Sequence, residues 1–264
     1  MKFSEFIKTN VAIFDGAMGT QLQGKGLKLG EVPETLNINN KDIIIEIHKK
    51  YIDAGAKVIT TNTFGANELK LEKTGYAVED IVASGIQAAR AAAADREDIF
   101  IALDMGPIGE LIEPMGSLSF DRAYEIYKRQ VVQGVKSGAD LILIETMTDL
   151  YELKAAVLAA KENSSLPVIA TMSFEKDHRT FTGCLPSSMA ITLEGLGADG
   201  LGINCSLGPA EIYPIVAELI KWTDVPILIQ ANAGLPTVRN NIACYDVGPD
   251  EFAEAAVDFV RLGV

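Results

Sequence analysis

The sequence predicts an α/β fold of the TIM-barrel, or (β/α)₈, type. Short runs rich in valine and isoleucine alternate with longer segments of helical periodicity. The first half of each run is continuously apolar, as expected for parallel strands that are buried on both faces. The units recur at even spacing, and no linker or change in composition interrupts the chain, so we expect one domain over residues 1–264.

Parallel strands with right-handed crossovers allow either a doubly wound sheet or a barrel, and the chain length and even spacing favour the barrel. The chain stops at Val264, where an eighth strand would begin, so we expect seven β/α units and no eighth strand in this chain. The seven strands are expected at residues 11–17, 57–64, 99–106, 141–147, 167–174, 200–206 and 226–234.

The helices between these strands carry local signals at their ends. Asp149 is expected to cap the helix that follows it, with Glu152 three residues later in the position of a capping box. Two later helices begin with the pattern Gly-Pro-x-Glu, which puts a proline in the first turn. His48 lies in the middle of the helix expected at 42–56, where a packing or surface role is expected.

The composition excludes several classes of function. Acidic residues outnumber basic ones by 36 to 23, a formal charge of -13, which argues against nucleic acid and anionic membranes as partners. Three cysteines do not form a disulfide framework, and Cys184 and Cys244 lie in loop-like stretches without metal-ligand spacing. The first residues do not resemble a signal peptide, and no apolar stretch approaches the roughly 18 residues of a membrane span. We therefore expect a cytoplasmic protein.

Polar side chains gather where the expected strands end, which is where barrel enzymes carry their active sites. None of these strand ends carries lysine or histidine, so a Schiff-base mechanism is not expected. A carboxylate that follows an apolar strand is costly to bury without a partner. Asp15 and Glu145 facing one pocket would suit an ammonium group or a divalent metal, although ion pairing within the barrel rim is an alternative.

Cys205 is the third notable strand-end residue. A free cysteine in such a place can be an inert buried thiol, but its position beside Asn204 favours a functional role. A different hypothesis is a Mg²⁺ enzyme that uses the carboxylates of Asp15, Asp104 and Glu145.

The segments "FDGAMGTQL", "TNTFGAN", "GPIGEL" with "MGSLSF", "ETMTDLYELKAA", "GINCSLGP" and "ANAGLP" form a specific set. As a set, they resemble the homocysteine S-methyltransferase family over nearly the whole chain, and most closely the N-terminal homocysteine-binding modules of its cobalamin-dependent members. The resemblance implies a (β/α)₈ barrel with a catalytic zinc (Zn²⁺) bound by three cysteines. Cys205 matches the first, whereas the other two belong to a Gly-Gly-Cys-Cys-Gly motif that this sequence does not contain.

The resemblance also implies roles for individual residues. Asp15 and Glu145 would engage the ammonium group of homocysteine, backbone N–H groups would meet its carboxylate, and Asn232 would be a zinc ligand in the absence of substrate. The substrate-binding residues implied are Asp15, Gly16, Ala17, Glu145, Asn204 and Ser206.

The implied function is zinc-dependent transfer of a methyl group to the thiol of homocysteine, which forms methionine. The expected donor is methylcobalamin held by a corrinoid protein partner or another domain, because nothing in this sequence resembles a cobalamin- or folate-binding module. Betaine or S-methylmethionine as donor, and a catalytically inactive binding module, are the alternatives.

Overall fold

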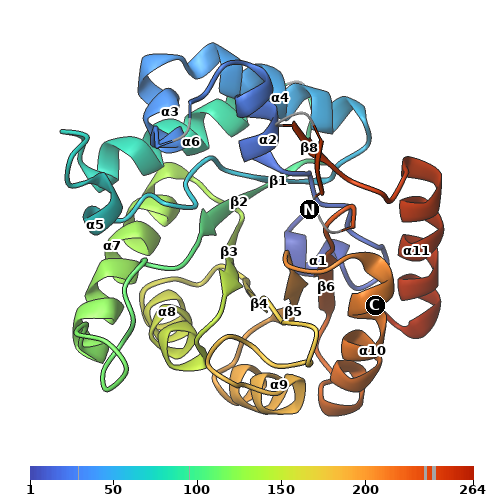
Figure 1. Cartoon of the computed structure of the whole chain (residues 1–264). Coiled ribbons are helices and arrows are strands. Elements are labelled where there is room, and N and C mark those ends of the chain that lie inside the picture. Colours follow the sequence, from blue (N-terminus) through green and yellow to red (C-terminus); the bar gives the residue numbers. More distant parts are fainter. Residues whose placement is uncertain (29, 95, 235–236, 240–241) are drawn as a thin grey trace.

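Six parallel strands form the central sheet of the computed structural model, which describes residues 1–28, 30–94, 96–234, 237–239 and 242–264. The strands pair in chain order, and the sheet curls into a partial barrel with helices around its outside (Figure 1). The strands are β1 (Val58–Thr60), β2 (Phe100–Met105), β3 (Leu141–Met147), β4 (Val168–Met172), β5 (Gly200–Asn204) and β6 (Ile227–Gln230).

The first expected strand, at 11–17, is present only as a single parallel bridge between Phe14 and Val58. The backbone N–H groups of Lys57 and Val58 both donate to the carbonyl of Ile13, and pairing goes little further. The side chain of Ile13 is 56% exposed, so this segment lacks the burial on both faces that would extend a strand. The expectation of seven complete units is therefore not confirmed.

The helices follow the strands as expected for β/α units. The principal ones are α4 (Lys41–Asp53), α6 (Val78–Ala92), α7 (Phe120–Ser137), α8 (Leu150–Asn163), α9 (Pro186–Gly195), α10 (Pro209–Leu219) and α11 (Pro249–Leu262). Short helical elements are α1 (Phe3–Phe6), α2 (Met18–Gly24), η1 (Pro33–Thr35), α3 (Leu36–Asn39), α5 (Glu68–Leu71) and η2 (Ile220–Trp222). Within the described part of the chain, no helix has the length and apolar character that crossing a membrane requires.

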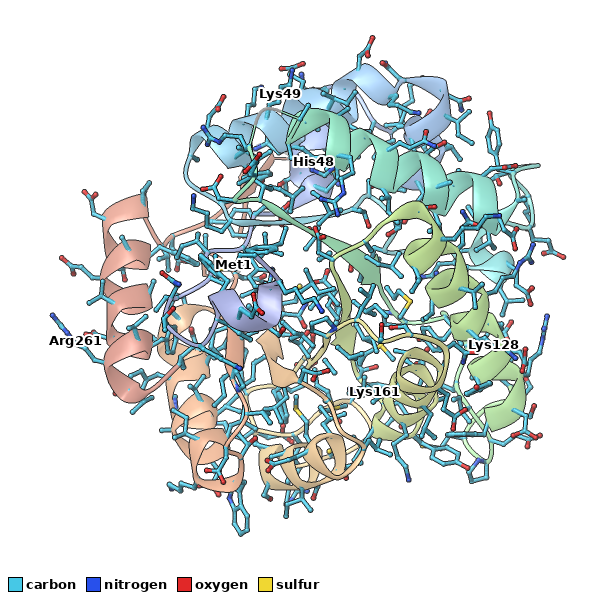
Figure 2. The ribbon with its side chains drawn as sticks, turned by 180° about the vertical axis from the view of Figure 1, so that it is seen from behind. Met1, His48, Lys49, Lys128, Lys161 and Arg261 are labelled. Atoms are coloured by element: carbon cyan, nitrogen blue, oxygen red, sulfur yellow. The ribbon has the colours of Figure 1, made fainter. Side chains whose placement is uncertain are left out.

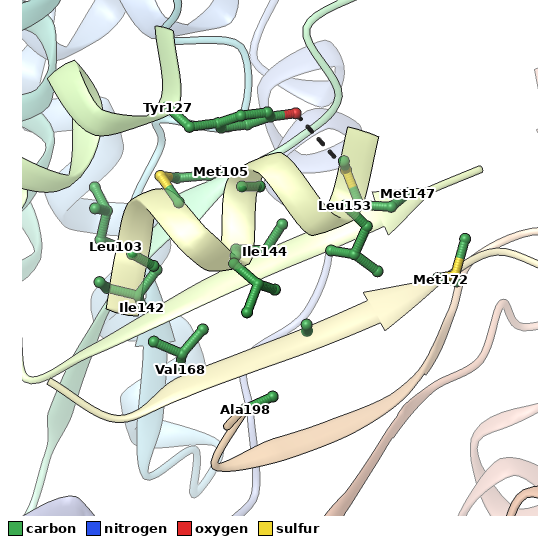
Figure 3. Close-up of a cluster of buried hydrophobic side chains, with 14 of the residues drawn as sticks. Leu103, Met105, Tyr127, Ile142, Ile144, Met147, Leu153, Val168, Met172 and Ala198 are labelled. Carbon is green, nitrogen blue, oxygen red and sulfur yellow. Dashed lines mark hydrogen bonds between the residues drawn. The ribbon is translucent and has the colours of Figure 1, made fainter. Parts of the chain in front are cut away.

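The main core lies between the outer face of the sheet and the helices. Ile142 and Ile144 of β3 belong to the same buried cluster as Leu153 of α8 and Tyr127 of α7 (Figure 3). The Tyr127 hydroxyl lies 3.9 Å from the sulfur of Met147. This packing fixes β3 rigidly, which matters because β3 carries Glu145.

The amino-terminal end of the sheet is filled by an aromatic cluster. The ring of Phe3 in α1 packs edge-on against Phe100, with 5.4 Å between ring centroids, and against Phe14 at 6.5 Å. Figure 2, seen from behind, shows Met1 and this helix in the middle of the ring of helices. Apolar side chains thus close the amino-terminal end of the sheet. The polar residues that end the strands lie at its opposite, carboxyl end.

Several local expectations can be compared with the structure. Asp149 caps α8, because its side chain accepts a hydrogen bond from the Tyr151 backbone at 2.9 Å. Glu152 does not complete a capping box at this helix end but turns away to tertiary partners, described below. Cys244, expected in a loop, ends β8 (Ile242–Cys244), which forms an antiparallel hairpin with β7 (Thr237–Arg239).

Candidate functional site

Asp15 is held at the carboxyl end of β1 by two hydrogen bonds from one residue. The Thr60 backbone N–H donates to Asp15 Oδ2 at 3.0 Å, and the Thr60 hydroxyl donates to Oδ1 at 2.8 Å. The side chain is 9% exposed. Burial raises the pKa of Asp15 to about 8, and the nearby charge of Glu145 adds to the rise, whereas the bonds from Thr60 oppose it.

Two further carboxylates share this region. Burial raises the pKa of Glu145 on β3 to about 7. Asp104 on β2 is 6% exposed, and burial, followed by the charges of Glu145 and Asp15, raises its pKa well above the usual range. Among the residues that the structure describes, none of the three makes an ion pair. The site therefore gathers three carboxyl groups whose raised pKa values favour the protonated form, and among the described residues none of them is paired with lysine or arginine.

Asn204, at the end of β5, ties three strands together with its side chain. Its Oδ1 accepts hydrogen bonds from the Thr146 backbone at 2.8 Å and from the Thr171 hydroxyl at 2.7 Å. Its Nδ2 donates to the Thr146 hydroxyl at 2.7 Å and contacts the sulfur of Cys205 at 3.5 Å. An amide side chain has two donors and one acceptor oxygen with two lone pairs, so these four contacts use its full capacity.

The backbone around Asn204 adopts an uncommon conformation. Thr146, Cys205 and Ser206 have φ angles of 61°, 58° and 61°, in the left-handed region that non-glycine residues seldom enter. Such residues cost about 1 kcal/mol or more each and tend to cluster at functional sites. The Cys205 N–H donates to the carbonyl of Gln230 at 3.0 Å, which fixes the turn against β6.

The Cys205 side chain is half-buried at this turn. Burial raises the pKa of its thiol, and the negative charge of Glu145 adds to the rise. The thiol therefore stays protonated at neutral pH in the protein alone. The Thr146 hydroxyl lies 3.8 Å from the sulfur.

The turn after Asp15 is shaped by a close contact. A Cβ atom at Gly16 would lie 2.8 Å from the ring of Tyr51, so a side chain does not fit there without movement. The Tyr51 hydroxyl donates to the Ala17 carbonyl at 3.0 Å. The backbone N–H groups of Gly16 and Ala17 make no hydrogen bond to another described backbone group. Asn232 follows β6, and its N–H donates to the Leu207 carbonyl at 3.0 Å, beside the Cys205 turn.

The sequence-predicted residues thus fall at one end of the sheet, but they do not form a complete zinc site within the described residues. Zinc sites in proteins usually have three or four protein ligands. No group of three histidine, cysteine, aspartate or glutamate side chains in the described residues lies close enough together to hold a metal ion. Cys205 is a chemically suitable zinc ligand, and the other thiol that the structure describes, Cys184 in the loop after β4, does not complete a three-ligand group with it.

Sequence reasoning missed the residues that orient the site. Thr60 and Thr146 fix Asp15 and Asn204, and they looked like ordinary strand threonines. Glu152 was also missed: its Oε1 accepts from the Ile108 backbone at 2.7 Å and from the Tyr127 hydroxyl at 2.8 Å, so it holds the loop that follows β2. The one available signal was the position of Thr60 next to strand-end residues.

A partial α/β barrel with carboxylates, an amide and a thiol at the carboxyl ends of its strands has the arrangement in which barrel enzymes carry their active sites. The family model described as homocysteine S-methyltransferase matches residues 12–264. The chain therefore belongs to the homocysteine S-methyltransferase family.

Curated relatives agree with this assignment. The chain is 33% identical over 274 aligned residues to a methionine synthase from Mycobacterium tuberculosis, and 32% identical over 273 to one from Mycobacterium leprae. Each alignment covers 97% of this chain and 23% of the relative, so the chain spans about a quarter of the length of these proteins.

Solved structures show the same fold at low sequence identity. The oxidized form of the homocysteine methyltransferase MmuM from Escherichia coli matches with a TM-score of 0.83 at 19% identity, covering 98% of this chain and 90% of that chain. Its metallated form matches with a TM-score of 0.76 at 19% identity, covering 85% of each chain. These likenesses support a TIM-barrel type of fold.

Proposed function

We propose that this chain binds homocysteine at the carboxyl end of its strands and presents the thiol for methylation to methionine. The observation that carries the proposal is the gathering of Asp15, Glu145 and Cys205 at one end of the sheet in a member of this family. Carboxylates without cationic partners complement an ammonium group. The turn that carries the Cys205 thiol lies beside them, where a zinc ion bound to this thiol could also bind the sulfur of a substrate.

The amino acid part of homocysteine would be held from two sides. Its ammonium group would donate hydrogen bonds to Asp15 and Glu145, and its carboxylate would accept them from the free backbone N–H groups of Gly16 and Ala17 and near Ser206. Asn204 has no free donor or acceptor, so we assign it to positioning Cys205 and Thr146 instead of contacting substrate.

Methyl transfer to sulfur requires a thiolate, and a free thiol with a pKa near 8.5 is only a few per cent ionised at pH 7. Zinc with protein thiolate ligands lowers the pKa of a bound thiol, and Cys205 would provide one such ligand, with Asn232 as a second candidate. The described residues do not supply the remaining ligands. The chain's own contribution is therefore to bind and orient homocysteine.

The methyl donor is proposed to be a corrinoid carried by a separate module, as the resemblance to the cobalamin-dependent members implies. Betaine and S-methylmethionine are the competing donors. The donors would be separated by supplying each with homocysteine and zinc to this chain extended by an eighth strand that carries the adjacent cysteine pair, and measuring methionine by mass spectrometry. Methionine formed with methylcobalamin alone supports the corrinoid assignment, and methionine formed only with one of the other two contradicts it.

The substrate assignment is tested by binding. Glu145→Gln keeps the size of the side chain but removes its charge, so homocysteine affinity measured by calorimetry should fall by about 1.5–3 kcal/mol, the contribution of a hydrogen bond to a charged group. Glu175→Gln, in the loop after β4, is the matched control and should bind as the wild type does. Equal affinity of wild type and Glu145→Gln would contradict the assignment.

A further inference from the structure

Asp104 is the carboxylate of this site that no assigned role explains. It lies on β2, paired in register with Leu143 of β3, and its side chain is 6% exposed. Its Oδ1 atom is buried and has no hydrogen-bond partner among the described residues. Buried polar atoms are nearly always hydrogen-bonded, and an unpartnered one costs about 1–3 kcal/mol, more when it is charged.

The protein does not supply the missing partner from its own cations. Lys70 is the one positive charge that acts on the pKa of Asp104, and its Nζ donates to the Pro107 carbonyl at 2.7 Å. Glu145, Asp15 and Glu34 act in the opposite sense. Asp104 therefore lies among more carboxyl groups than cations, and a positively charged donor from a ligand would both pair with its free oxygen and balance these groups when they ionise.

The geometry favours a polyatomic cation over a bare metal ion. The carboxylates of Asp15, Asp104 and Glu145 do not converge closely enough to form a three-ligand metal site among the described side chains. An ammonium group has three N–H donors, and an N–H···O hydrogen bond is longer than a metal–oxygen bond, so an ammonium group tolerates a wider spacing of carboxyl oxygens than a divalent metal ion does. The bonds from Thr60 leave lone pairs free on both oxygens of Asp15.

We propose that Asp104 is a third ammonium-binding carboxylate, which makes the pocket specific for thiol substrates that carry a free, cationic amino group. The inference rests on the proposed function and extends it. It assigns Asp104 to specificity: a substrate without the amino group, or with an acylated one, leaves Oδ1 unpartnered and brings its own carboxylate next to three carboxyl groups with no positive charge to offset it.

The test compares two ligands that differ in the amino group alone. Methionine and 4-(methylsulfanyl)butanoate share the thioether and the carboxylate, and a thioether has no proton to lose. Calorimetry on wild type, Asp104→Asn and the control Asp199→Asn gives the affinity ratio of the two ligands for each protein. Asp199 lies at the opposite end of the sheet, where it accepts from the Val168 backbone, so its substitution changes the net charge without touching the pocket.

In Asp104→Asn, the preference for methionine over the analogue should fall at least about tenfold relative to wild type, the size of one hydrogen bond to a charged group. Asp199→Asn should keep the wild-type ratio. The melting temperature of ligand-free Asp104→Asn should stay close to that of wild type, because Oδ1 makes no hydrogen bond that the substitution would remove. Asp104→Ala should give the same change in ratio, and it replaces Asp104→Asn if that variant does not fold.

An unchanged ratio in Asp104→Asn, or an equal loss of affinity for both ligands, would overturn the inference and leave the proposed function standing. A lower melting temperature together with equal losses would identify Asp104 as a structural residue. If wild type binds neither homocysteine nor methionine, the proposed function itself fails, and the role of Asp104 fails with it.

Discussion

Binding of an amino acid to this pocket should be linked to the release of a proton. Burial raises the pKa of Asp15 to about 8 in the free protein, so at pH 7 this carboxyl group is mostly protonated. An ammonium group attracts the ionised form and must displace that proton when it binds. Affinity for homocysteine should therefore increase as the pH rises towards 8.

The size of the effect follows from the distance between the working pH and this pKa. A pH of 7 is about one unit below the Asp15 pKa of about 8. Removing the proton from Asp15 at that pH costs about 1.4 kcal/mol, which lowers the affinity by a factor of about ten. Between pH 6 and pH 7 the change should be at least as large, because burial also raises the pKa of Glu145, to about 7. Calorimetry at pH 7 in buffers of different ionisation enthalpy should count at least one proton released per homocysteine bound, because the pKa values of Glu145 and Asp104 are raised as well as that of Asp15.

The same experiment has an internal control of opposite sign. The analogue 4-(methylsulfanyl)butanoate brings no ammonium group, so ionisation of Asp15 repels it, and its affinity should fall as the pH rises from 6 to 8. A homocysteine affinity that does not change over this range, with no proton released at pH 7, would refute the assignment of the ammonium group to these carboxylates.

Two further perturbations test other parts of the molecule. Burial lowers the pKa of His48, which is labelled in Figure 2, from 6.5 to about 4. As the pH falls below 6.5, His48 therefore binds a proton in the unfolded chain but stays neutral in the folded chain until about pH 4. Urea unfolding should show that wild type loses about 3 kcal/mol of stability relative to His48→Leu between pH 7 and pH 4, whatever the raised carboxyl pKa values add to both proteins; parallel pH profiles of the two would contradict this. Zinc retained after dialysis of this 264-residue polypeptide should be below one ion per chain and should fall further in Cys205→Ala; one tightly held ion per wild-type chain, measured by plasma mass spectrometry, would contradict the incomplete donor set.

The fold was predictable where burial alone decides it. The strand at 141–147 is buried on both faces through its first half, and its bounds were predicted correctly. The segment at 11–17 also has four apolar residues followed by a carboxylate, but it lies at the edge of the sheet, and a local apolar pattern does not reveal which strand will be at an edge. Glu152 illustrates a second limit, because its partners Ile108 and Tyr127 come from distant parts of the chain.

The site was predictable in its residues but less so in their roles. Asp15, Glu145 and Cys205 were identified because a charged or reactive side chain after an apolar strand is unusual. The roles of Asn204 and Asp104 depend on which hydrogen bonds are already made, and a sequence does not show that. Asn204 uses all its bonding capacity within the protein, whereas Asp104 keeps a buried oxygen free.

Asn204 and Asp104 have opposite effects on the stability of the ligand-free site. The left-handed residues Thr146, Cys205 and Ser206 would relax if nothing held them, and Asn204 contacts Thr146 and Cys205 directly. Asn204 therefore stabilises a strained turn in the absence of any ligand. Asp104 does the reverse, because its unpartnered oxygen destabilises the free protein and would be satisfied by the ammonium group that we assign to it. In such a site Asn204 keeps the turn in place without a ligand, and Asp104 increases the affinity for a ligand that carries a positive charge.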